Sequence, residues 1–293
     1  MTLDIEVRRL TLKYGRQRAL EDISFKLQGG KIYGLLGRNG SGKTSLLSVL
    51  ASLRKQSGGE VFIGGQHPYE NAAITSQVCM VGESVHFADS SSIKDVLRLA
   101  EICWPNWDGE YASRLLDTYE LPLKKRIDGL SRGMKSALSV TIGLSSRAPV
   151  TIFDEAYIGM DAPSRYAFYD EVLKDYMEHP RTIILSSHLI EEIENLFEEV
   201  LILDRGKLLI HEESEAFRTR GASITGPEHQ IDAIASELQV LNEQKLGSTK
   251  SVTVYGELPA RLLERIEREG LAVGPVSLQD LFVHMTKKGA KER

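Results

Sequence analysis

Eight consecutive residues near the N-terminus have the types and spacing of a phosphate-binding loop. They fit the pattern G-x-x-x-x-G-K-[ST] and read Gly37, Arg38, Asn39, Gly40, Ser41, Gly42, Lys43 and Thr44. Glycines let the backbone turn so that successive N–H groups point at one anion. The Lys43 ammonium would reach the β- and γ-phosphates of a bound nucleotide, and the Thr44 hydroxyl would bind Mg²⁺. These residue types therefore predict a site for a nucleoside triphosphate and magnesium.

Two adjacent acids follow an apolar stretch later in the chain. Asp154 and Glu155 come directly after residues 150–153, which are typical of a buried parallel strand. Beside a phosphate-binding loop, Asp154 would hold Mg²⁺ through water. Glu155 would then act as the general base that polarises an attacking water. The alternative is an acidic strand end that only faces solvent.

Three further residues are candidates for phosphate contacts. Ser131 and Gly133 precede a helix that we expect to begin near Lys135, and both would bind phosphate at its N-terminus. The alternative, equally favoured by these residues alone, is that Ser131 only caps that helix. His188 follows an apolar run at 182–187, where it would sense a γ-phosphate at the strand ends. A lone histidine at such a place is otherwise structural.

The elements that would position these residues can be read from the hydrophobic pattern. Residues 31–36 form a short apolar strand before the loop, and Ser45 opens a helix after it. Further apolar, β-branched runs at 78–82, 150–153 and 182–185 predict strands of a central parallel sheet. The loop thus lies between strand and helix, where its mechanism requires it.

Other parts of the chain show different patterns. Residues 3–14 and 23–27 alternate apolar and polar, which predicts half-buried antiparallel strands. Residues 84–148 are helical in pattern, whereas 200–210 predict a hairpin. Beyond residue 221 the pattern is α+β, with strands at 223–225 and 251–255 and helices at 227–238, 258–269 and 277–287.

These patterns predict two domains. Residues 1–213 would form an α/β cassette with a mixed sheet core, an antiparallel β subdomain and a helical subdomain at about 84–148. Residues 214–221 would be a linker, and 222–293 a small α+β accessory domain.

Composition narrows the classes of partner. The chain has 293 residues, a net charge of −5 and two cysteines. The negative charge does not favour nucleic acid as a partner, and two thiols suit a reducing compartment. The N-terminus has early acids and no apolar segment of a signal peptide, and no run approaches the length of a membrane span. We therefore expect contact with a membrane only through a partner protein.

Together, in this order, the stretches resemble the ATP-binding cassette of ABC transporters, over residues 3–212. The matching elements are Walker A at 37–44, the signature at 130–134, Walker B at 152–155, the D-loop at 159–161, the switch histidine His188 and the adenine-stacking aromatic Tyr14. The segment 104–108 and the Arg-Gly-Met of the signature further resemble the YtrB-type branch of bacterial cassettes. For Tyr14, the alternative is a core residue at a strand end.

The resemblance implies a P-loop NTPase cassette that serves as the ATPase subunit of an ABC transporter. Two cassettes, in a homodimer or a heterodimer, would face each other head to tail. Each ATP with its Mg²⁺ would lie between two chains. One chain would contribute Walker A and the adjoining Ser45, and the other would contribute Ser131 and Gly133. The chain would then act at the cytoplasmic face of the cell membrane through integral membrane permease subunits. Export is the direction we expect, and the permease contact would lie in segment 84–128, with Trp104 and Trp107.

Departures from the family pattern leave alternatives open. Arg132 and Met134 replace a glycine and a glutamine of the usual signature. Glu83 stands where the family has a glutamine, so it still offers an oxygen to Mg²⁺ or water but adds a negative charge near phosphate. A regulatory cassette with little hydrolysis, or a cassette protein outside transport, are the remaining interpretations.

Overall fold

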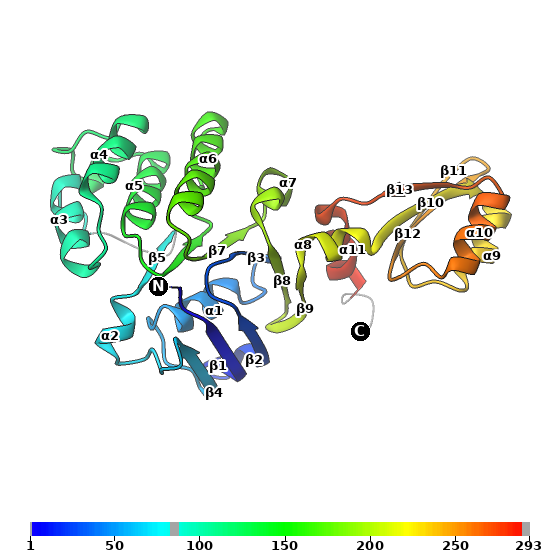
Figure 1. Cartoon of the computed structure of the whole chain (residues 1–293), viewed down its shortest axis with the longest axis horizontal. Helices are drawn as coiled ribbons and strands as arrows, with labels where there is room; N and C mark the ends of the chain where they lie inside the picture. Colours follow the sequence, from blue (N-terminus) through cyan, green and yellow to red (C-terminus); the bar gives the residue numbers. More distant parts are fainter. Residues whose placement is uncertain (1, 83–87, 289–293) are drawn as a thin grey trace. The chain divides into compact units, whose positions relative to one another are not determined.

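The computed structural model describes residues 2–82 and 88–288, and the chain divides into two compact units (Figure 1). One unit, here called the cassette, contains residues 1–188 and 196–211. The other, here called the C-terminal unit, contains residues 189–195 and 212–293. Among the described residues, no helix is both long and apolar enough to cross a membrane.

A six-stranded sheet forms the centre of the cassette. Its strand order is β5-β6-β7-β3-β8-β9, with bounds Val78–Gly82, Val150–Asp154, Thr182–Ser187, Ile32–Gly37, Glu199–Asp204 and Lys207–Glu213. Strand β3 pairs in parallel with both β7 and β8, and β6 pairs in parallel with β5 and β7. Parallel strands end at the same edge, so the residues that follow β3, β6 and β7 meet there. The predicted α/β fold with a parallel core is confirmed.

An antiparallel sheet packs with this centre in one hydrophobic core. Its order is β2-β1-β4, with bounds Gln17–Leu27, Ile5–Tyr14 and Gly58–Ile63. Alternate apolar residues of β1 and β2 are buried together with the apolar face of α1 (Lys43–Leu50), as the alternating pattern predicts. The short helix α2 (Ala72–Thr75) then leads into β5.

The rest of the described cassette includes four helices and a 3₁₀ turn. They are α3 (Ile93–Cys103), α4 (Gly109–Thr118), α5 (Arg132–Ser145) and α6 (Ala162–Glu178), and the turn is Ile127–Gly129. The helical pattern at 84–148 predicted α3, α4 and α5, but α5 begins at Arg132 rather than near Lys135. The reason is that Ser131 is the N-cap, with its Oγ accepting the Met134 N–H at 3.2 Å.

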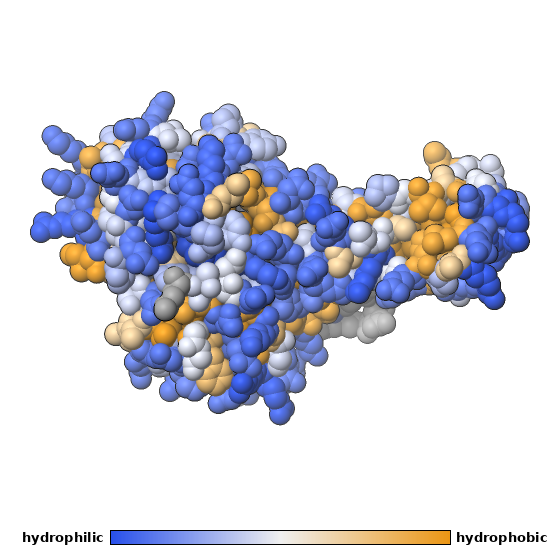
Figure 2. All heavy atoms as spheres, viewed as in Figure 1, coloured by the Kyte–Doolittle hydropathy of each residue, from blue (hydrophilic) through white to orange (hydrophobic). Residues whose placement is uncertain are grey.

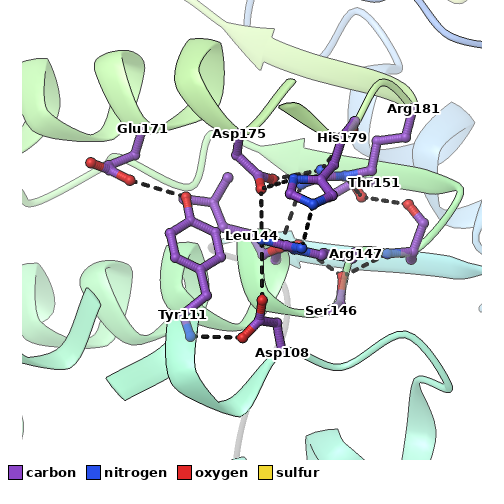
Figure 3. Close-up of polar contacts among 12 residues, drawn as sticks. Asp108, Tyr111, Leu144, Ser146, Arg147, Thr151, Glu171, Asp175, His179 and Arg181 are labelled. Carbon is purple, nitrogen blue, oxygen red and sulfur yellow. Dashed lines mark hydrogen bonds and ion pairs between the residues drawn. The ribbon is translucent and has the colours of Figure 1, made fainter. Parts of the chain in front are cut away.

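Charged side chains fasten these helices to one another and to the sheet (Figure 3). Arg147, just after α5, pairs with Asp108 before α4 at 3.1 Å and with Asp175 of α6 at 3.5 Å. Arg181 pairs with the same Asp175 at 2.5 Å and donates to Thr151 of β6 at 3.1 Å. Because Asp175 and Arg181 are almost fully buried, each needs the other's charge. This network fixes the helical region on the sheet that carries the site.

The C-terminal unit is a split β-α-β-β-α-β fold. It comprises β10 (Gly221–Pro227), α9 (Glu228–Ala235), β11 (Val240–Leu246), β12 (Thr249–Tyr255), α10 (Ala260–Arg268) and β13 (Ala272–Pro275). The strands form an antiparallel sheet in the order β11-β12-β10-β13, and α9 and α10 share its hydrophobic core.

Further helices of this unit lie outside the β-α-β-β-α-β fold. They are α7 (Ile190–Ile193) with the 3₁₀ turn Glu194–Leu196, α8 (Ser214–Thr219) and α11 (Leu278–Lys288). Residues 214–221, expected as a linker, instead fold as α8 and the first residue of β10. The physical reason is Phe217, which is fully buried and packs on the Tyr255 ring at 5.3 Å between centroids. Strands β11 and β13 were not predicted, since one is polar and the other has four residues.

Candidate functional site

The phosphate-binding loop connects the end of β3 to the start of α1. The Ser41 N–H donates to the Arg38 carbonyl at 3.0 Å, which curls the loop. Gly40 and Gly42 have φ angles of +78° and +107°, in the region that favours glycine. A Cβ on Gly42 would also lie 2.8 Å from Leu20 Cδ2 and 2.9 Å from the Ala19 carbonyl. The loop therefore has the strand–loop–helix geometry that its sequence predicts.

Donors of this loop fit an anion. Ser41 is buried, and its Oγ has no hydrogen-bond partner within residues 2–82 and 88–288. A phosphate oxygen would satisfy this orphaned hydroxyl, which is costly to leave unpaired. Lys43 is almost fully buried, and its Nζ donates to the Gly37 carbonyl at 2.7 Å. Arg38, Asn39 and Thr44 are exposed, so their side chains are open to a ligand.

One serine of β7 holds both acids at the end of β6. The Ser186 Oγ donates to Asp154 Oδ1 at 2.6 Å and accepts the Glu155 N–H at 3.0 Å. Glu155 has a φ of +51°, which is strained for a residue other than glycine. Such strain persists where surrounding contacts fix the backbone, and it turns the Glu155 carboxylate toward the loop lysine. The Lys43 Nζ lies 3.4 Å from Glu155 Oε1.

His188, after β7, meets the same carboxylate. Its Nδ1 lies 3.2 Å from Glu155 Oε2 and 3.3 Å from the Tyr157 hydroxyl. The His188 N–H donates to that hydroxyl at 3.1 Å, and Ser187 Oγ lies 2.8 Å from it. Tyr157 is buried, so its hydroxyl holds His188 in a fixed position. Sequence reasoning missed Tyr157, because an aromatic after two acids cannot be told from a core residue.

Removing the Tyr157 hydroxyl should slow hydrolysis without weakening ATP binding. Tyr157→Phe loses hydrogen bonds to the backbone and ring of His188. Each is worth about 1 kcal/mol, so we expect kcat to fall about three- to tenfold with KM unchanged. Steady-state ATPase kinetics measure both. The matched control is Tyr176→Phe, which loses hydrogen bonds to the Gly30 carbonyl and Glu198 instead. Equal kcat in the two variants would contradict a positioning role for Tyr157.

Tyr14 lies beside the helix that follows the loop. It ends β1, and its hydroxyl is 3.2 Å from Ser45 Oγ of α1. The residue remains 39% exposed. The Tyr14 ring is thus held beside the helix that follows the loop and is partly open to solvent.

Ser131 and Gly133 line a separate pocket. It has a volume of about 260 Å³ and is lined by both residues together with Gly159 and Asp161 of the D-loop. A Cβ on Gly133 would lie 2.6 Å from the Gly159 carbonyl, so glycine is needed for this close approach. No hydrogen bond joins Ser131 or Gly133 to the phosphate-binding loop in the described part of the chain. Ser131 therefore caps α5 and lies beside this pocket.

Magnesium would find hard oxygen donors at the loop. The exposed Thr44 hydroxyl and the Asp154 carboxylate are of the kind that Mg²⁺ prefers, with substrate phosphates completing the set. No group of three or more His, Cys, Asp or Glu side chains suited to a metal occurs among the residues that the structure describes. Glu83, the other predicted magnesium ligand, lies outside the described residues.

Comparisons with known proteins identify relatives of this chain. Residues 20–157 match the family model described as ABC transporter. The chain is 28% identical over 204 residues to the ABC transporter ATP-binding protein YtrB of Bacillus subtilis, which covers 70% of each chain. It is 25% identical over 307 residues to the Nod factor export ATP-binding protein I of Cupriavidus metallidurans, over the whole of both chains.

A solved structure has the same fold. The ATP-binding subunit of an ABC transporter superposes with a TM-score of 0.66 and 23% identity. The match covers 73% of this chain and 92% of the other. At this identity the match is evidence for the fold of the cassette.

Proposed function

The chain belongs, through its cassette, to the ABC transporter family of ATP-binding ATPases, and from this premise we propose which residues bind and hydrolyse ATP. The observation that carries the proposal is the meeting of Lys43 and His188 on one carboxylate, Glu155. These three residues come from the ends of different elements and converge beside an orphaned phosphate-loop hydroxyl.

In the binding step, the loop takes the β- and γ-phosphates. The Lys43 ammonium leaves the Glu155 carboxylate and binds a phosphate oxygen instead. The unpaired Ser41 hydroxyl donates a hydrogen bond to phosphate. Mg²⁺, held by Thr44 and Asp154, would neutralise charge on the β- and γ-phosphates. Ser186 keeps Asp154 and the Glu155 backbone in place throughout. Tyr14 would contribute stacking against the base.

In the hydrolysis step, Glu155 receives the proton of the attacking water. Once Lys43 has turned to phosphate, the carboxylate is free to act as a general base. His188 holds Glu155 through Nδ1 and would contact the γ-phosphate through its other nitrogen. Phosphoryl transfer depends mainly on position and charge, and the contacts through Tyr157 and Ser186 supply the position.

The signature pocket supports a composite site shared by two chains. Ser131 and Gly133 line their own pocket with the D-loop, and Ser131 lies at an α5 N-terminus with no acid in its first turn. Such a surface favours an anion brought by another molecule. In a head-to-tail pair, that anion would be the γ-phosphate held by the partner's loop.

Solution mass tests the composite site. Glu155→Gln should be a monomer alone and double in mass with MgATP, because two trapped triphosphates hold the cassettes together. Light scattering with and without MgATP measures this. A Ser131→Arg second change, which fills the signature pocket, should keep the protein monomeric. A chain that binds ATP but stays monomeric would contradict a homodimer and indicate a different partner cassette.

A membrane permease is the proposed mechanical partner. Figure 2 shows a small hydrophobic patch where Figure 1 places α3, and Leu99 and Ile102 of that helix are 60% and 75% exposed. These residues support a docking surface on the helical region. Trp104, which we expected there, is half-buried, with its indole N–H donating to the Val78 carbonyl at 3.1 Å. The tryptophan therefore belongs to the packing of the cassette.

Export and a cytoplasmic position at the cell membrane complete the proposal. The relative matched along its whole length is named for export. Work at the membrane would then depend on the permease rather than on a span of this chain. Co-purification of permease subunits from membranes tests the assignment, and a chain that stays free of them would contradict it.

A further inference from the structure

A cation covers one side of the ring proposed to stack on the base. The Arg54 guanidinium carbon lies over the Tyr14 ring, 4.7 Å from its centroid. Tyr14 is nevertheless 39% exposed. Because the ring contacts a guanidinium yet Tyr14 stays partly exposed, it retains surface on which another planar group can stack.

The backbone around Arg54 is fixed to the elements that form the site. The N–H groups of Leu53 and Arg54 both donate to the Ser48 carbonyl of α1, at 2.9 and 3.1 Å. Ser57, at the end of the same loop, donates its N–H to the Thr11 carbonyl and accepts the Lys13 N–H on its hydroxyl. The loop is thus tied to α1, which follows the phosphate-binding loop, and to β1, which carries Tyr14.

The ring is therefore held from two directions. Its hydroxyl contacts Ser45 of α1, and its face contacts Arg54 from the loop after α1. Within the described ranges, no carboxylate forms an ion pair with Arg54, so the ring is the partner of its charge. Guanidinium groups stack well on tyrosine because they are planar and weakly hydrated.

We propose that Arg54 and Tyr14 form a two-layer platform for the purine base, with Arg54 below the ring and adenine on the open face. This inference rests on the proposed ATP site and deepens it, by assigning the base-binding part of the affinity to a residue outside the sequence motifs. The cation fixes the ring plane before the nucleotide arrives and draws electron density from the ring. An electron-rich purine then stacks on it more favourably.

Paired ligands test this platform without interference from hydrolysis. MgADP and magnesium pyrophosphate bind the same loop, but only ADP carries a base. In the full chain, Arg54→Ala should raise the Kd of ADP about three- to tenfold, the range expected for a stacking contact. The Kd of pyrophosphate should stay unchanged. Isothermal titration calorimetry measures both.

Three further variants are compared with Arg54→Ala. Tyr14→Ala should lose more ADP affinity than Arg54→Ala and should likewise leave pyrophosphate binding alone. Arg54→Lys keeps the charge but not the plane, so it should recover only part of the affinity. Lys55→Ala is the matched control, since it removes the next cation of the same loop, which rests on the Tyr69 ring at 5.3 Å. It should bind both ligands as the parent does.

Each other outcome overturns the platform. If ADP and pyrophosphate weaken equally, Arg54 contacts phosphate. If ADP binds more tightly to Arg54→Ala, the guanidinium occupies the face that the base needs. If ADP affinity does not change, Arg54 has no part in base binding. A parent chain that binds neither ligand would instead contradict the nucleotide site itself, which keeps the two failures distinct.

Discussion

Glu155→Gln should bind ATP at least as well as the parent chain yet lose at least ~10²-fold in turnover, the low end of general-base contributions. Glutamine has the shape of glutamate but does not accept a proton from water. The carboxylate lies 3.4 Å from Lys43 and 3.2 Å from His188, so no other described acid shares its place. Removing its negative charge also removes repulsion toward the phosphates and frees Lys43, which is why binding should not weaken.

Two measurements separate catalysis from folding in this variant. Steady-state phosphate release gives kcat, and titration with ATP gives Kd. The matched control is Glu171→Gln, another carboxylate of the cassette, whose role is to accept the Tyr111 hydroxyl at 3.1 Å. That control should keep parental turnover. Near-normal turnover of Glu155→Gln would exclude Glu155 as the base, and loss of ATP binding would point to a structural role for it.

The residues that the sequence predicted share one physical feature. Lys43, Asp154, Glu155 and His188 all follow or end buried strands whose apolar runs are continuous. Such runs indicate parallel strands, and parallel strands bring their carboxyl ends to one edge. The sequence motifs therefore predict that these residues lie close together, even when the order of the strands in the sheet is not known. Because β7 lies between β6 and β3 in the sheet, Ser186 of β7 lies between the two acids and the loop.

The residues that were missed act through neighbours far away in sequence. The Tyr157 hydroxyl and Ser186 Oγ have roles only because β6 and β7 are adjacent. Arg54 contacts Tyr14 only because a loop after α1 returns to β1. Hydroxyls and arginines are common on any surface, so their partners decide their roles. Residues 214–221 were misjudged for the same reason, since the burial of Phe217 depends on Tyr255.

Lys43→Ala should abolish measurable hydrolysis and raise the Kd of ATP roughly 10- to 100-fold. The ammonium is the one cation of the loop that is buried in the described structure, and hydrogen bonds from charged groups contribute about 1.5–3 kcal/mol. Titration with ATP and a phosphate-release assay measure the two effects. Binding as tight as in the parent chain would contradict the assignment of the loop.

The Lys43–Glu155 contact can be tested by comparing the effect of Lys43→Ala in the parent chain with its effect in the Glu155→Gln variant. Lys43 contacts the Glu155 carboxylate and donates to the Gly37 carbonyl, so a phosphate of ATP would have to replace a carboxylate at this lysine. In Glu155→Gln that competitor is neutral, and the same lysine should then contribute more to ATP affinity. Lys43→Ala should therefore weaken ATP binding more in the Glu155→Gln background than in the parent, which is a measurable coupling between the two residues.

Lys31→Ala is the matched control, because Lys31 pairs with Glu199 instead. It should change ATP affinity in neither background. Equal losses in both backgrounds would show that Glu155 does not compete with phosphate for Lys43.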